Sequence, residues 1–177
     1  GYNTGKVKGC TNSATVTLAT GFQESYMGGI VGINVSSGTI IGCINTGAVS
    51  GYSGVGGIAG YNDRGTVVAC GNTGSVTYTY GNAGGIVGFT SGYNGADTRI
   101  IGCWSGDTNE HNGTNEVTGD KNGIGNESEY LTISKCFSGD VATINGKVSD
   151  MNTAIGNTYG YIWQTGTDGY PTLVATE

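Results

Sequence analysis

A short glycine-rich motif recurs along the chain with a fixed spacing of 28 residues. It reads Gly-Gly-Ile, then Val or Ala, then Gly, and its complete copies span residues 28–32, 56–60 and 84–88. Shorter copies, each lacking one residue of the motif, occur at 123–126 and 154–157. A constant period of this length indicates a repeat architecture, because one such unit cannot bury its apolar side alone. The chain is therefore expected to stack nearly identical units.

Cysteine and valine follow the same period. Each repeat has one cysteine with an aliphatic residue three positions before it, and in most repeats a Val follows five or six positions later. The short runs between these positions are rich in β-branched residues and are separated by Gly, Asn, Ser and Thr, which is typical of strands and turns. The cysteines are Cys10, Cys43, Cys70, Cys103 and Cys136, and the aligned valines are Val16, Val49, Val76 and Val141.

These columns predict an all-β fold, a right-handed parallel β-helix (β-solenoid) with about 28 residues per coil and about five to six coils. Each strand would pair with its equivalent one coil further on, so that like side chains form columns through the interior. Residues 1–156 would form the repeat domain, with coils at about 1–27, 28–55, 56–83, 84–121 and 122–152, and residues 157–177, rich in aromatic side chains, would cap it. One column would hold Ile30, Ile58, Ile86, Ile124 and Ile155.

The glycine content fits this fold and excludes others. The 177 residues include 36 Gly and one Pro, whereas collagen needs abundant Pro and a helical bundle cannot absorb this much Gly. Coil corners need tight turns, and a positive φ there favours glycine. We therefore expect corners at Gly28, Gly29, Gly32, Gly56, Gly57, Gly60, Gly84, Gly85 and Gly88.

The charge pattern excludes two classes of partner. The net charge is −6, and the seven Lys and Arg residues are scattered singly. Nucleic acids and anionic membrane surfaces both require clustered basic residues, so neither is an expected partner. No run approaches the roughly 18 apolar residues of a membrane span, and we expect no membrane insertion.

The repeated tetrads at 29–32, 57–60 and 85–88, with a downstream Cys-x-Asn-x-Gly, resemble the GLUG-motif repeat. The resemblance covers residues 1 to about 156, and the tail from Trp163 to Leu173 looks like the end segment of that family. The resemblance implies a region of a large bacterial surface or secreted protein, often adhesin-like, or an accessory region of an IgA-specific metallopeptidase. The zinc chemistry of those peptidases is not carried over, because the chain has one His and no His-Glu-x-x-His helix.

The cysteine column is expected to be structural. One cysteine per coil and an odd count favour buried free thiols, because in-register side chains point in parallel and suit a disulfide poorly. Parallel thiols also cannot surround a tetrahedral zinc ion. We expect no metal and no cofactor.

The coil that begins at Gly84 is about ten residues too long, and the excess is predicted near residues 107–116. Loops on a rigid scaffold often carry binding, so this segment is the candidate recognition loop; a calcium site and a solvated excursion are the alternatives. The candidate binding residues are Asp107, Glu110, His111, Glu116 and Asp120.

Other surface features point to weaker alternatives. Asp107 and Asp140 each follow a cysteine by four residues, but no carboxylate pair recurs as glycoside hydrolysis would require. The Thr-x-Thr pairs at 15–17 and 77–79 do not recur on every coil, so an ice-binding array is not expected. Tyrosines near turns or on outward positions could hold sugars or proteins, or simply stack on the sheet surface: Tyr52, Tyr61, Tyr78, Tyr80 and Tyr93.

Together these patterns predict a non-catalytic structural or adhesive module of a bacterial cell-surface or secreted protein, in which a stiff stem displays loops that bind host protein or glycan. The alternatives are an accessory region of a secreted IgA-type metallopeptidase and a β-helix polysaccharide-processing enzyme. Residues 1–3 align with 60–62, halfway round a coil, so further coils are expected to precede them. The uncapped first coil is expected to make end-to-end contacts.

Overall fold

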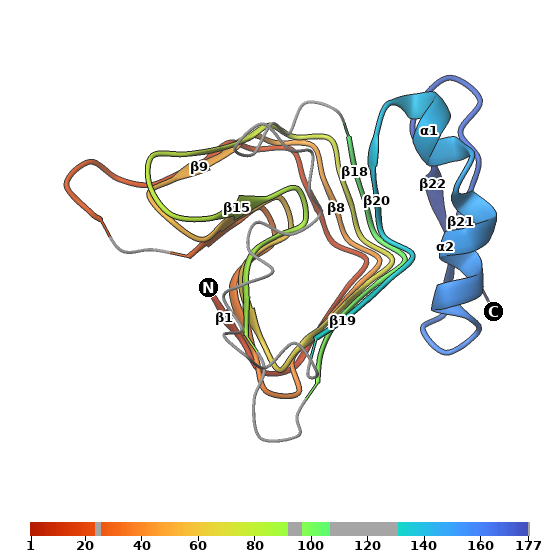
Figure 1. The fold of residues 1–177 in the computed structure, drawn as a ribbon, viewed down its shortest axis with the longest axis horizontal. Coiled ribbons are helices and arrows are strands. Elements are labelled where there is room, and N and C mark those ends of the chain that lie inside the picture. The colour runs from red at the N-terminus through yellow and green to blue at the C-terminus, as the bar shows by residue number, and fades with distance from the viewer. Residues whose placement is uncertain (24–25, 92–96, 107–130, 177) are drawn as a thin grey trace.

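The computed structural model describes residues 1–23, 26–91, 97–106 and 131–176, and it is a parallel β-solenoid (Figure 1). Successive coils overlie one another in the view down the stack, as the prediction required. One sheet contains β1 (Tyr2–Asn3), β6 (Val31–Val35), β11 (Ala59–Asp63) and β16 (Val87–Ser91). A second contains β5 (Met27–Gly28), β10 (Val55–Gly56) and β15 (Ala83–Gly84).

Three further parallel sheets complete the coils. The third contains β2 (Lys6–Lys8), β7 (Thr39–Ile41), β12 (Thr66–Val68), β17 (Thr98–Ile101) and β19 (Leu131–Ser134). The fourth contains β3 (Thr11–Asn12), β8 (Ile44–Asn45), β13 (Gly71–Asn72), β18 (Trp104–Gly106) and β20 (Phe137–Gly139). The fifth contains β4 (Val16–Thr17), β9 (Val49–Gly51) and β14 (Val76–Tyr78).

The interior columns follow the predicted register. Val67 on β12 pairs with Ile40 on β7 and with Ile100 on β17, and all three side chains are fully buried. The isoleucines of the three complete motifs belong to the same core cluster as four of the cysteines, Cys43, Cys70, Cys103 and Cys136. The valine column forms a separate small core under the fifth sheet, where Val49 and Val76 pack against Val55 and Ala83.

Two residues predicted to lie in these columns lie elsewhere. Val141 begins helix α1 (Val141–Asn145), because Asp140 caps that helix by accepting a hydrogen bond from the Thr143 backbone N–H at 2.7 Å. Ile155 ends helix α2 (Val148–Ile155) and packs on the outside of the coils. The remaining predicted member of the isoleucine column, Ile124, lies outside the described residues.

The coils differ in length, and part of the predicted insertion lies earlier than expected. Asp63 pairs with Ser91, and Thr66 pairs with Arg99. Asp63 and Thr66 are three positions apart, whereas their partners Ser91 and Arg99 are eight positions apart. Five extra residues therefore fall between Ser91 and Arg99.

The C-terminal segment lies along the side of the stack, outside the corner between β19 and β20 in Figure 1, although residues 157–177 were expected to cover an end. It comprises α1, α2 and the antiparallel hairpin of β21 (Tyr161–Gln164) and β22 (Thr172–Ala175). The buried Trp163 anchors it, and its indole N–H donates to the Gly102 carbonyl at 2.7 Å.

The side position follows from the corner glycines that precede three of the five cysteines; Ala69 and Lys135 hold the same corner before the other two. Gly9, Gly42 and Gly102 have φ of 63°, 62° and 58°, and their missing side chains leave room for the segment. A Cβ on Gly42 would lie 2.8 Å from the Tyr161 ring, and one on Gly102 would lie 2.5 Å from the Ile155 side chain. These glycines both turn the chain and form the docking surface.

Candidate functional site

The predicted binding residues Asp107, Glu110, His111, Glu116 and Asp120 lie outside the described residues. The described aspartates have local partners. Asp63 accepts two hydrogen bonds from Arg64, at 3.0 and 2.8 Å, and Asp97 pairs with Arg99 at 2.9 Å. Within the described ranges, no three His, Cys, Asp or Glu residues lie close enough together to hold a metal ion.

The cysteine column consists of free thiols. The backbone N–H of Cys70 donates to the sulfur of Cys103 at 3.4 Å, and the Cys103 N–H donates to Cys136 in the same way. Burial raises the pKa of the Cys70, Cys103 and Cys136 thiols well above the usual range. Cys10 differs from these thiols, because it is exposed at the first coil.

The paired glycines of the repeated motif are required by close packing, and not by the positive φ that the corner interpretation predicted. Gly28, Gly29, Gly56 and Gly57 are absent from the positive-φ residues. A Cβ on Gly57 would overlap the Gly85 carbonyl oxygen and the side-chain amide of Asn72. The motif therefore lets the backbone approach the neighbouring coil and a buried asparagine.

That asparagine belongs to one of two asparagine ladders, rows of side-chain amides bonded from coil to coil. In one ladder the Asn12 amide donates to Asn45 at 2.8 Å, and Asn45 donates to Asn72 at 2.8 Å. In the other, Asn3 donates to Asn34 and Asn34 donates to Asn62. Each amide of the first ladder also donates to a carbonyl two residues ahead, so its polar atoms are satisfied without water.

The sequence contained a signal for the first ladder. Asn follows Cys by two positions in the first three repeats, and in the second and third it belongs to a Cys-x-Asn-x-Gly phrase. Taken alone this phrase predicts a turn, because Asn and Gly are common turn residues. Only the coil register shows that these amides lie above one another and point inward.

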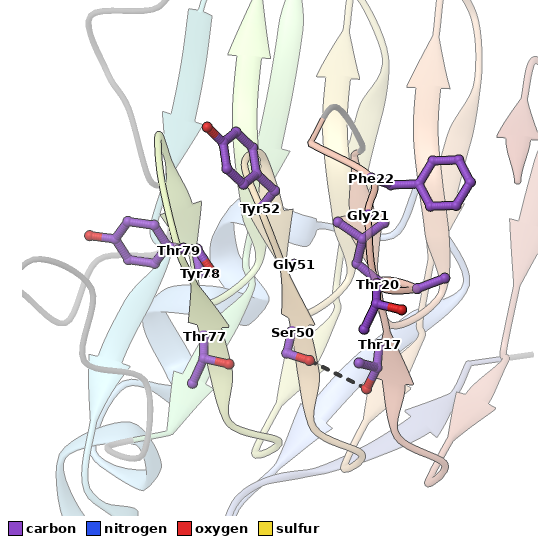
Figure 2. Close-up of a pocket in the computed structure, with 12 residues that line it drawn as sticks. Thr17, Thr20, Gly21, Phe22, Ser50, Gly51, Tyr52, Thr77, Tyr78 and Thr79 are labelled. Atoms are coloured by element: carbon purple, nitrogen blue, oxygen red, sulfur yellow. Dashed lines mark hydrogen bonds between the residues drawn. The ribbon is translucent and has the colours of Figure 1, made fainter.

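A groove runs over the outer face of the fifth sheet, and we call it the hydroxyl groove (Figure 2). Thr17, Ser50 and Thr77 form its floor, one on each of β4, β9 and β14, and the strand register places them side by side. The loop 18–22 and Tyr52 form the walls, and the cavity volume is about 280 Å³. Ser50 donates to the Thr17 hydroxyl at 3.3 Å.

The aromatic residues of the hydroxyl groove continue into a stacked pair. The Tyr52 ring stacks on Tyr80 with centroids 5.6 Å apart and an interplanar angle of 26°. The Tyr80 side chain is 68% exposed, and Phe22 in the loop 18–22 is 65% exposed. No lining residue of the groove carries a formal charge. Tyr52 and Tyr78 line the groove and Tyr80 stacks on Tyr52, and their sugar- or protein-binding role stays a prediction.

A second aromatic stack lies on the first sheet. Tyr26 stacks on Tyr61 with centroids 4.7 Å apart, and Tyr61 contacts Phe89 at 5.3 Å. The Tyr61 hydroxyl lies 2.6 Å from that of Ser91, which donates to Asp63. Burial raises the pKa of Tyr61. These contacts fasten the first-coil loop to the stack. Tyr93, the remaining predicted aromatic, lies outside the described residues.

No helix among the described residues is long and apolar enough to cross a membrane.

Comparison with known proteins gives a likeness of fold. No family model matches the chain, and no curated protein matches it. It superposes on the crystal structure of a candidate immunoglobulin A1 protease from Bacteroides ovatus with a TM-score of 0.62 and 18% sequence identity. The match covers 98% of this chain and 59% of the other, so this chain spans about three fifths of that protein's length.

Proposed function

We propose that the chain is a non-catalytic structural and adhesive module of a bacterial cell-surface or secreted protein. In this proposal a stiff stem presents surface residues that bind host protein or glycan, outside the cell. The observation that supports it is the way the interior amides are used. Asn45 and Asn34 are fully buried, and their hydrogen bonds run to neighbouring coils and to their own turns. The interior polar groups hold the stack together, which leaves the outer surface for recognition.

A combined binding and turnover experiment tests this function. The intact chain is applied to arrays of host proteins and glycans, and is separately incubated with immunoglobulin A, casein and acidic polysaccharides. We expect retention on at least one array without cleavage of any substrate. Cleavage by the purified chain would contradict the non-catalytic part of the proposal, and an empty array would contradict the adhesive part.

The predicted recognition loop is tested in the same arrays. A variant lacking residues 107–116 is compared with the intact chain after circular dichroism has established that both are folded. If the loop displays binding residues such as Asp107 and His111, its deletion abolishes retention on some array positions. Unchanged retention at every position would contradict a role for the loop.

A second function is favoured by the likeness to the Bacteroides ovatus structure. The chain would then be an accessory region of a secreted IgA-type metallopeptidase, as the GLUG resemblance also implies. The gene that encodes the chain distinguishes the two functions. A zinc-peptidase domain in the same polypeptide would favour the accessory region, whereas a cell-wall or outer-membrane anchor would favour the adhesive stem.

A further inference from the structure

The hydroxyl groove has a polar floor, aromatic walls and no formal charge, which are properties of a carbohydrate site. We propose that it binds a neutral oligosaccharide through one or two of its sugar rings. This inference rests on the proposed binding function of the module, and it adds the location of a site and the chemical class of its ligand.

The floor matches the hydrogen-bonding chemistry of a sugar. Thr17, Ser50 and Thr77 lie on adjacent strands, whose backbones are about 4.8 Å apart, and the Ser50 hydroxyl donates to that of Thr17 at 3.3 Å. A hydroxyl can donate one hydrogen bond and accept two, so the Thr17 and Thr77 hydroxyls can still donate to a sugar, and all three can accept from one. Figure 2 shows the three residues in a row across the strands. The row of protein hydroxyls can therefore form hydrogen bonds with the hydroxyls of an oligosaccharide.

The walls match the apolar face of a sugar ring. The Tyr52 ring lies beyond the hydroxyl row in Figure 2, and its stacking on Tyr80 holds it in place without help from a ligand. Aromatic faces carry partial negative charge and attract the polarised C–H groups of a pyranose. Tyr80 and Phe22 are both well exposed, and they extend the aromatic surface beyond the cavity.

The absence of charged residues from the lining of the groove favours a neutral ligand. No Lys, Arg, Asp or Glu lines it, and the chain as a whole carries a net charge of −6. An acidic polysaccharide would find no cation there and would be repelled by the molecule. Protein interfaces are enriched in Arg, Met and aromatic residues, and the groove has the aromatic residues but neither Arg nor Met. Its volume, about 280 Å³, is near the lower limit of roughly 300 Å³ for ligand pockets, which suits one or two sugar rings.

The test uses the intact chain and three neutral probes, maltohexaose, cellohexaose and chitohexaose, with hexagalacturonate as the acidic comparison. Saturation-transfer NMR and calorimetry measure binding. We expect at least one neutral probe to bind with a dissociation constant of about 1 mM or lower. Tyr52→Ala and Thr77→Val are each expected to weaken that binding about fivefold to tenfold, since each removes one contact.

Two matched variants separate a binding role from a folding role. Tyr52→Phe keeps the stacked ring and is expected to retain binding, and Tyr2→Ala removes an exposed tyrosine from another sheet and is expected to change nothing. Circular dichroism establishes that every variant is folded. Absence of binding to all neutral probes, stronger binding of hexagalacturonate, or binding that Tyr52→Ala leaves unchanged would each overturn the inference.

The proposed function can survive that result. If host-protein or other array positions retain the chain while no neutral probe binds, the carbohydrate inference is overturned and the adhesive function stands. If retention of a host protein is lost in Tyr52→Ala and no oligosaccharide binds, the groove is a protein site and the inference is again overturned.

Discussion

At the residue scale, the buried amide of Asn45 depends on several hydrogen bonds within the protein. It donates to the Gly47 carbonyl and to Asn72, each at 2.8 Å, and it accepts from Asn12. A buried polar group without a partner costs about 1–3 kcal/mol, so the ladder stabilises the fold only while every member is present. This all-or-none requirement makes each interior asparagine a test of the register.

Replacing Asn45 with Ala is expected to lower the free energy of unfolding by about 3 kcal/mol, because it removes the amide donor to the Gly47 carbonyl and one of the two donors to the Asn72 oxygen, and opens a small cavity. Urea unfolding monitored by circular dichroism measures the change. Asn12→Ala, at the partly exposed start of the ladder, is the control and should cost about 1 kcal/mol. Equal losses in both variants would argue against a buried ladder.

A second prediction concerns the repeated glycines. Gly57→Ala is expected to destabilise the protein by about 3 kcal/mol or more, because the new Cβ would overlap the Gly85 backbone and Asn72. Gly169→Ala is the matched control, since a Cβ there meets no atom within 4 Å. Thermal unfolding compares the two. A Gly57→Ala variant as stable as the control would show that the coils are not in close contact at the motif.

The cysteine column predicts a pH dependence. A buried thiol whose pKa is raised stays protonated in the folded chain while the unfolded chain ionises near pH 8.5, so the unfolded chain binds fewer protons and stability falls as pH rises. The slope from each such thiol grows with pH and approaches about 1.4 kcal/mol per pH unit once the unfolded thiol is fully ionised. Urea unfolding between about pH 8 and 9.5 measures the slope. Cys103→Ala, which removes a buried thiol, should reduce it.

At the same scale, the sequence predicted which residues lie in the core columns better than it predicted why the packing requires those residue types. Constant spacing was enough to place Ile58, Val67 and Cys70 in the interior. It could not show why Gly57 must be glycine, because that depends on an asparagine 15 positions away that stacking brings beside it. The hydroxyl groove could not be predicted from the sequence for the same reason, since its floor combines residues from three coils.

At the scale of elements, the side segment and the coils meet through a column of corner residues. Tyr161 and Leu173 fill the space above Gly42, and Trp163 packs against Trp104 with ring centroids 5.7 Å apart. Large side chains on one element thus occupy positions where the other has none. This complementarity explains why the most aromatic part of the chain lies beside the stack.

Trp163→Ala is expected to lower stability by about 3–5 kcal/mol, because it removes a buried ring and the hydrogen bond to Gly102. The effect should be local. Amides of α2 and β21 should exchange with solvent faster, whereas those of β7 and β12 should keep their protection. Hydrogen exchange with mass spectrometry measures both regions, and Trp163→Phe is the milder control. Equal deprotection of β12 would show that coils and side segment unfold together.

The elements that departed from the prediction share one cause. Val141 and Ile155 satisfied the column spacing, but local helix signals outweighed it, including the cap at Asp140. Periodicity predicts the strand positions of a repeat only where neighbouring coils supply the strands that pair with them. Beyond the last coil, capping and packing against the corner glycines decide the structure.

At the scale of the molecule, the first coil has open strand edges. Among the described residues, β1, β2, β3, β4 and β5 each end one side of a sheet. Unpaired edges can pair with strands of another molecule, so we propose end-to-end contact between copies. Sedimentation over a range of concentrations should reveal association, and Thr11→Lys on β3 should weaken it by placing a charge at the edge. Thr165→Lys, exposed on the side segment, should leave it unchanged, and strictly monomeric behaviour at all concentrations would contradict the proposal.

The asparagine ladders also give the stack a direction. The amides bonded between coils all donate toward the next coil in sequence, from Asn12 to Asn45 to Asn72 and from Asn3 to Asn34 to Asn62. Recombination that deletes or duplicates one whole 28-residue unit would therefore still place a donor opposite an acceptor at the new junction. The length of the stem can change in evolution, or by engineering, without any new chemistry in its core.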